Sequence, residues 1–154
     1  DRYGVLCMTP NPVDILMWAH YGEQHEGVCL QIDAEVCFNY VPALPRIDFL
    51  ASWLSDDDDS ALNQAQEMTF TKWDKWQQEG EVRFAISEML KQVDSRVVDF
   101  PEEIYKGVIV GAKTPPSFLT TIKTILRNKQ NSIPLYRVVP KNEEYKLELN
   151  EIDY

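Results

Sequence analysis

The chain has few of the residues on which metal and thiol chemistry depend. Its 154 residues include three Cys and two His, and no two Cys form a Cys-x-x-Cys pair. His20 and His25 are five residues apart, which does not match the i, i+4 spacing that puts two imidazoles on one helical face. We therefore predict no metal site. An odd number of cysteines without regular spacing is typical of reduced thiols and indicates a cytoplasmic protein.

Long apolar runs and a glycine-rich phosphate loop are also missing. No stretch of about 18 apolar residues occurs, so the sequence predicts no membrane-spanning helix. Gly107 and Gly111 flank an apolar run with the spacing of a strand, not that of a phosphate-binding loop. The chain begins with Asp1 instead of Met, and we expect it to be the later part of a longer protein or one trimmed to its ordered core.

Basic residues are scarce relative to acidic ones. Fifteen Lys and Arg stand against 25 Asp and Glu, which gives a formal net charge of −10. This charge repels phosphate and argues against non-specific nucleic-acid binding. A local basic pocket could still form from Lys72, Lys75 and Arg83. The acidic run Asp56–Asp59 is interpreted as a solvated segment.

The length and the 44% apolar content fit one domain of ordinary size with a sizeable core. We therefore expect residues 1–154 to form a single domain. Segments with strand and helix patterns mix without strict alternation, which predicts an α+β fold with a mixed, largely antiparallel sheet and two to four helices.

Strand patterns recur along the chain. The run Tyr3–Thr9 is almost continuously apolar, which predicts a strand buried on both faces. The predicted strands are Tyr3–Thr9, Gly27–Asp33, Phe38–Leu44, Glu81–Ile86, Glu103–Gly111, Ile133–Val139 and Tyr145–Leu149. Glu88–Phe100 is ambiguous and fits a helical turn followed by a short strand at Arg96–Val98.

Three segments carry helix signals. Asn11 is a suitable N-cap and Pro12 suits a first helical position. Asp59–Trp76 has a mainly helical pattern. Thr114 is a second suitable cap, and Pro115 begins a third helix. The apolar stripe of that third helix consists of Phe118, Leu119, Ile122, Ile125 and Leu126.

A first candidate site lies where the first helix meets the second strand. Trp18, His20 and Tyr21 end the helix, and a polar loop leads into Gly27. Loops between regular elements often carry binding residues. The alternative is structural: Trp18 and Tyr21 are core or boundary aromatics, and His20 is a boundary histidine.

The most informative segment is Trp76–Arg83, with the sequence Trp-Gln-Gln-Glu-Gly-Glu-Val-Arg. An extended conformation would put Glu79, Glu81 and Arg83 on one face of a strand. Nearby Lys and Arg would keep both carboxylates ionised. An ionised Glu can accept a hydrogen bond from a sugar hydroxyl or stabilise an oxocarbenium ion. The alternative is a salt-bridged surface strand.

Three segments in this order resemble the prokaryotic domain-of-unknown-function family 2971. They are Trp18–Leu30, Lys72–Arg83, and Ile109–Gly111 with the helix and the Tyr145–Leu149 strand that follow. The resemblance covers Tyr3–Asp153. Members typically carry more chain upstream, with a short Tyr-rich strand, and the family has no firmly assigned activity.

The order of elements around Glu-x-Glu is also similar to that of ADP-ribosyltransferases. In those enzymes an early Arg or His holds NAD, a Ser-Thr-Ser-like strand packs the nicotinamide pocket, and the second Glu stabilises the transition state. The similarity implies that Glu81 is the second Glu and that Glu79 assists the acceptor. Cys7–Thr9 would occupy the Ser-Thr-Ser position, from which it departs at two of three places. The early Arg would be Arg2 out of register, or would come from upstream.

The same resemblance implies NAD as a possible substrate, and the sequence identifies no cofactor with certainty. Tyr21 and Trp76 would stack on a base or on the nicotinamide ring, and Arg83 would set the ionisation of the carboxylates. We place Thr9 and His20 in the same binding site.

Two hypotheses follow. The first is an enzyme that transfers or cleaves at a ribosyl C1 with Glu81 and Glu79. The second is a non-catalytic module that binds a nucleotide or a protein partner, in defence or regulation. A concave pocket beside Tyr21 and Trp76 that the two glutamates line would favour the enzyme. Exposure of both glutamates on a flat strand, or their ion pairs with Lys72 and Lys75, would favour the module. Substrate and oligomeric state stay open.

Overall fold

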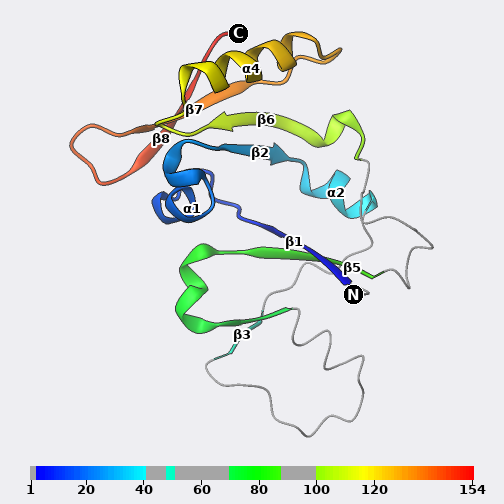
Figure 1. Ribbon diagram of the computed structural model, residues 1–154. Helices are drawn as coiled ribbons and strands as arrows, with labels where there is room; N and C mark the ends of the chain where they lie inside the picture. The colour runs from blue at the N-terminus through cyan, green and yellow to red at the C-terminus, as the bar shows by residue number, and fades with distance from the viewer. Residues whose placement is uncertain (1–2, 41–47, 51–69, 88–99) are drawn as a thin grey trace, which may run out of the picture. The chain divides into compact units, whose positions relative to one another are not determined.

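The computed structural model describes residues 3–40, 48–50, 70–87 and 100–154. The chain divides into two compact units. Unit 1 consists of Asp1–Pro10 and Phe38–Asp99, and unit 2 consists of Asn11–Cys37 and Phe100–Tyr154. Figure 1 shows their helices and strands. The expectation of a single domain stays a prediction.

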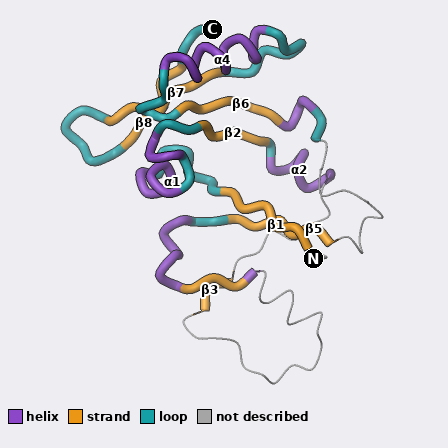
Figure 2. The backbone as a smooth tube through the Cα atoms, in the orientation of Figure 1, coloured by secondary structure: helices purple, strands orange, loops and turns teal. Residues whose placement is uncertain are grey.

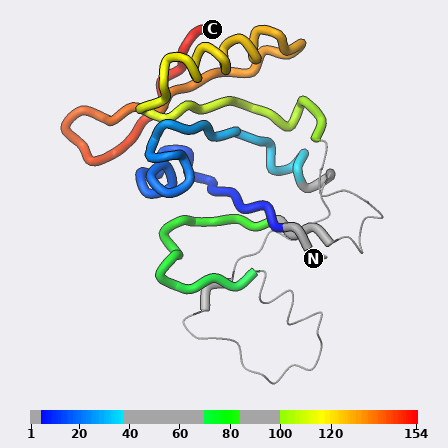
Figure 3. Tube along the Cα trace, viewed as in Figure 1, coloured from blue at the N-terminus to red at the C-terminus, as the bar shows by residue number. Residues whose placement is uncertain are grey.

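A four-stranded sheet forms the centre of unit 2. Its strands are β2 (Val28–Ile32), β6 (Tyr105–Val110), β7 (Leu135–Pro140) and β8 (Leu147–Glu151), in the order β2-β6-β7-β8. The pairs β2–β6 and β7–β8 are antiparallel, and β6–β7 is parallel. Figure 2 shows these strands side by side. Figure 3 shows that β2 and β6, which are neighbours in the sheet, come from distant parts of the sequence.

The core of unit 2 lies on both faces of β6. Successive side chains of a strand point to opposite faces. Val108 and Val110 therefore pack in one buried cluster with Ile122 and Leu126 of helix α4 (Pro116–Arg127). The remaining central residue, Ile109, packs with Trp18 of helix α1 and with Val138. The apolar run predicted as a buried strand is confirmed, because Val108–Val110 are all buried.

Helix α1 (Ile15–His20) begins later than the sequence predicts. Its N-cap is Asp14, whose Oδ1 accepts hydrogen bonds from the backbone N–H groups of Leu16 (2.8 Å) and Met17 (2.9 Å). Asn11, the expected cap, instead accepts from the N–H of Val13 at 3.2 Å in the preceding turn. The expected start was wrong because two good capping residues stand three positions apart, and Asp14 captures the N–H groups of the helix.

Helix α4 also lacks the cap that the sequence predicts. Its N-cap is Pro115, which has no capping side chain. The hydroxyl of Thr114 donates to the carbonyl of Gly27 at 3.3 Å. The apolar stripe is only partly confirmed, because Phe118 and Ile125 are 40% and 53% exposed.

Helix α2 (Ala34–Tyr40) replaces part of a predicted strand. The carboxylate of Asp33 accepts from the N–H groups of Glu35 (2.9 Å) and Val36 (3.2 Å), as an N-cap does. The strand predicted at Phe38–Leu44 is therefore wrong for residues 38–40. Its remaining residues lie outside the described ranges.

A left-handed turn, η1 (Glu23–His25), connects α1 to β2. Its three residues have φ values of 47°, 55° and 73°, a conformation that costs a non-glycine residue about 1–2 kcal/mol. The carbonyl of His25 accepts from the N–H of Lys113 at 2.9 Å. The same carbonyl approaches Gly111 so closely that a Cβ on Gly111 would lie 2.0 Å from its oxygen. Packing against Gly111 therefore holds the turn in this conformation.

Unit 1 contains two strand pairs among the described residues. Strand β1 (Tyr3–Met8) pairs with β5 (Val82–Ser87) in antiparallel register. Strand β3 (Asp48–Leu50) pairs with β4 (Thr71–Trp73) in parallel register. The strand prediction for β1 is confirmed, but its burial on both faces is wrong: Val5 and Leu6 are 48% and 36% exposed.

The helix predicted at Asp59–Trp76 is wrong from Thr71 onward, although Phe70 is helical. Thr71–Trp73 is strand β4, and a 3-10 helix, η2 (Asp74–Glu79), follows. Residues 59–69 lie outside the described ranges. Thr71 and Trp73 favour strand conformation, which outweighs the helical spacing of the apolar residues. The predicted α+β class is confirmed, with mixed and mostly antiparallel pairing.

Candidate functional site

A tight turn, not a continuous strand, brings Glu79 and Glu81 together. Glu79 is the last residue of η2, and Gly80 caps this helix with a left-handed φ of 54°. The N–H of Gly80 donates to the carbonyl of Gln77 at 3.1 Å. The prediction that Glu79, Glu81 and Arg83 share one face of a strand is therefore wrong at Glu79. Glycine adopts this φ without the steric cost that other residues have.

The ammonium of Lys72 lies between the two carboxylates. It donates a short hydrogen bond to Oε2 of Glu79 and another to Oε2 of Glu81. Glu79 and Glu81 are only 7% and 8% exposed. Lys72 reaches them from β4, seven and nine residues earlier in the chain. Desolvation lowers the pKa of Lys72, but the two carboxylates outweigh it and raise the pKa above its usual value.

Arg83 adds a second cation to Glu81. Its Nε donates to Oε1 of Glu81 at 2.8 Å, and Nη2 donates to Oε2 at 3.3 Å. Nη1 donates to the carbonyl of Thr71 at 3.2 Å, so the same guanidinium also ties β4 to β5. We call Lys72, Glu79, Glu81 and Arg83 the ion cluster. Its two anions and two cations balance.

Strand β1 closes the ion cluster from another side. Cys7 stands opposite Arg83 in the β1–β5 register, and its thiol hydrogen-bonds to Glu81. The hydroxyl of Thr9 donates to the backbone carbonyl of Glu79 at 3.3 Å. The apolar run around Cys7 predicts that this residue lies in the core. The prediction is wrong, because Cys7 is exposed and contacts the ion cluster. Alternation along β1 was the signal that could have placed it there.

The cluster keeps Glu81 ionised and Cys7 protonated. Desolvation opposes ionisation of Glu81, but hydrogen bonds from Arg83, Cys7 and Lys72 outweigh it and lower its pKa from 4.5 to about 2. Desolvation at the sulfur, together with the hydrogen bond and negative charge of Glu81, raises the pKa of Cys7 from 9.0 to about 11. Cys7 is therefore a poor nucleophile near neutral pH, because the thiolate is the reactive form.

The lowered pKa of Glu81 predicts a loss of stability in acid. A carboxyl whose pKa is lower in the folded state stabilises the fold above its unfolded pKa, and this contribution is lost as pH falls through the folded pKa. For Glu81 the loss begins near pH 4.5 and continues to about pH 2. We expect urea denaturation to show a wild-type advantage over Glu81→Gln at pH 7 that shrinks across this range. An advantage independent of pH would contradict the assignment.

The remaining predicted site residues lie in different units. Trp76 and Thr9 belong to unit 1, as does the ion cluster, and Nζ of Lys72 lies 5.8 Å from the Trp76 ring centroid. Tyr21 and His20 belong to unit 2, where both are exposed and their rings meet edge to face at 6.4 Å. Their role beside Glu81 stays a prediction.

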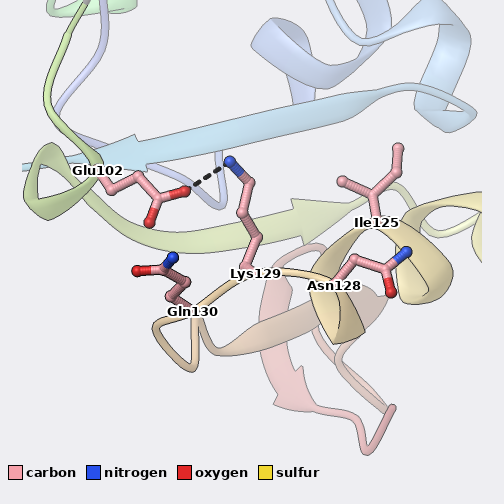
Figure 4. A pocket seen from close by; sticks show the side chains of 5 residues that line it. All are labelled: Glu102, Ile125, Asn128, Lys129 and Gln130. Atoms are coloured by element: carbon pink, nitrogen blue, oxygen red, sulfur yellow. Dashed lines mark hydrogen bonds and ion pairs between the residues drawn. The ribbon is translucent and has the colours of Figure 1, made fainter.

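The structure also shows an open hollow in unit 2, at the C-terminal end of α4. Its volume is about 540 Å³, and Figure 4 shows the side chains of Glu102, Ile125, Asn128, Lys129 and Gln130 around it. Lys129 pairs with Glu102 at 2.7 Å, so the two charges that line the hollow neutralise each other. None of the predicted site residues lines this hollow.

Two further results concern the described part of the chain alone. No three His, Cys, Asp or Glu side chains there gather closely enough to hold a metal ion. No described helix has both the length and the apolar character that crossing a membrane requires.

A scan against protein-family models, a search of curated proteins and a search of solved structures each gave no match. The resemblances to family 2971 and to ADP-ribosyltransferases therefore stay predictions.

Proposed function

We propose that this chain is a non-catalytic binding module that acts through a protein partner. The observation that carries the proposal is the position of Lys72 between Glu79 and Glu81. The sequence is compatible with two arrangements of these glutamates. They line a concave pocket that a ligand can enter, or they are held in ion pairs with nearby cations. Burial of both carboxylates and their ion pairs with Lys72 and Arg83 support the ion-paired arrangement.

The ion cluster is poorly suited to ribosyl chemistry. A carboxylate stabilises an oxocarbenium ion through its negative charge, and cations bound to the same carboxylate weaken this effect. Glu81 instead has Lys72 on one oxygen and Arg83 on both. It is also 8% exposed. These residues do not fit NAD as a substrate, because the negative charge that would face the sugar is already neutralised.

One observation favours the enzyme as a second candidate. The resemblance to ADP-ribosyltransferases implies that Cys7–Thr9 packs against the Glu-x-Glu residues. The contacts of the thiol of Cys7 with Glu81 and of Thr9 with Glu79 agree with that arrangement. The enzyme reading would need Lys72 to leave Glu81 before a sugar could approach.

The test is a calorimetric titration with NAD, followed by an assay of NAD consumption. We expect no saturable heat and no consumption, either with wild type or with Glu81→Gln. NAD consumption by wild type that disappears in a folded Glu81→Gln variant would contradict the proposal of a non-catalytic module and support the enzyme hypothesis. Saturable heat without consumption would redirect the proposal from a protein partner to a nucleotide.

A further inference from the structure

Two tryptophans stand exposed on the segment that the ion cluster holds. Trp73, the last residue of β4, is 54% exposed, and Trp76 in η2 is 41% exposed. Trp73 is the N-cap of η2 and Trp76 is the third residue of this helix, so the two exposed tryptophans lie three residues apart at the start of η2. Exposed indoles in a folded domain present apolar surface that a partner can bury. We call Trp73, Lys75 and Trp76 the tryptophan surface.

Lys75 adds a positive charge to the tryptophan surface. Nζ of Lys75 lies 4.6 Å from the centroid of the Trp73 ring, and Lys75 makes no ion pair with any residue that the structure describes. The charge of Lys72, which lies near Trp76, is already cancelled by Glu79 and Glu81. Among the described residues, no carboxylate therefore neutralises the ammonium of Lys75, which lies over the indole of Trp73.

The ion cluster gives this surface a fixed shape. Lys72 precedes Trp73 directly and is tied to both glutamates, and Arg83 holds the carbonyl of Thr71. Glu79 ends the same helix that carries Trp76. Both ends of the segment Thr71–Glu79 are thereby anchored. A surface ordered before binding loses less conformational entropy when a partner docks.

We propose that the tryptophan surface binds a protein partner through a short segment that carries apolar side chains and a carboxylate. This inference rests on the proposed function and names the chemistry of its partner. Apolar side chains of the partner would pack on Trp73 and Trp76. Tryptophan is among the residue types most enriched at interface hot spots. The carboxylate would pair with Lys75. A basic segment would leave Lys75 facing like charge.

A second copy of this chain is a less suitable occupant. Each copy carries a net charge of −10, so two copies repel each other over the distance at which they would meet. Two facing tryptophan surfaces would also bring the ammonium groups of both Lys75 residues together. Local charge complementarity therefore favours a different protein.

The probe is a phage-displayed library of random short peptides, selected on the wild-type protein. We expect selected peptides to combine apolar residues with Asp or Glu. For a synthetic selected peptide, Trp76→Ala should weaken binding about 30-fold, the size of an interface hot spot. Lys75→Met should weaken it by a smaller factor, and more so at low salt than at high salt. Phe118→Ala removes a comparably exposed aromatic from unit 2 and should leave the affinity unchanged.

Three results would overturn the inference: selected peptides without carboxylates, equal affinity for wild type and Trp76→Ala, or a wild-type dimer that Trp76→Ala dissociates in sedimentation analysis. The urea midpoint of each variant shows that it is folded. NAD consumption that depends on Glu81 would overturn the proposed function whatever the peptides do. If the peptide results contradict the inference and no NAD is consumed, only this inference is overturned and the proposed function stands.

Discussion

Replacing Lys72 by Met is expected to lower the free energy of unfolding by about 3–5 kcal/mol. The substitution keeps most of the side-chain volume and removes the ammonium that both carboxylates contact. Arg83 still pairs with Glu81, but both carboxylates lose the hydrogen bond and the positive charge of Lys72. A buried charge without its counter-ion is far more costly than an intact buried pair.

Urea denaturation at pH 7 measures this loss. Lys129→Met is the matched control, because it breaks the pair with Glu102 in which both side chains are about 40% exposed, and an exposed pair contributes at most about 1 kcal/mol. The double variant Lys72→Met with Glu79→Gln should recover part of the loss, since it also removes one of the two anions. Equal effects of Lys72→Met and Lys129→Met would contradict the buried cluster.

Replacing Gly111 by Ala is expected to destabilise unit 2 by about 3 kcal/mol or more, the upper range for overpacking. The added Cβ would lie 2.0 Å from the carbonyl oxygen of His25 and 2.5 Å from its carbon. Both are backbone atoms of the left-handed turn η1. Relief requires the turn to move, which would break the hydrogen bonds from Lys113 to His25 and from Gly111 to Gly27.

Gly107→Ala makes the same chemical change on strand β6 and serves as the control. Its nearest contact would be 2.7 Å from Oε1 of Gln31, the far end of a flexible side chain that can turn aside. Thermal denaturation should therefore show a much smaller loss for Gly107→Ala than for Gly111→Ala. A comparable loss for both would mean that general crowding, and not the position of the turn, sets the cost.

The sequence predicts the buried centre of the fold better than its irregular parts. The apolar run of β6 is confirmed because burial on both faces of a sheet demands continuous apolar residues. Strand β2 forms as predicted, but its apolar Val28 and Leu30 are 41% and 53% exposed. The predicted N-cap of α1, Asn11, was wrong because Asn11 and Asp14 have similar capping preference, and the local sequence does not show which of them caps the helix. The turn at Glu23–His25 was not predicted, since three successive non-glycine residues with positive φ carry no local signal.

The candidate site shows the same division. Its members Glu79, Glu81 and Arg83 are recognisable from their spacing. Their arrangement is not, because the left-handed φ of Gly80 turns Glu79 off the strand. The contact with Lys72 arises from the pairing of β4 with β3 and from the fold of η2. Neither follows from periodicity, which predicts a helix at Lys72.

The central claim is that Glu81 stabilises the fold and does not act in catalysis. The unfolding free energy of Glu81→Gln at pH 7 tests it most directly. The ion cluster predicts a loss of about 2 kcal/mol or more, because hydrogen bonds to charged groups are removed while Arg83 stays in place. Catalytic residues are often held at a cost to stability. A Glu81→Gln variant as stable as wild type, or more stable, would contradict the claim.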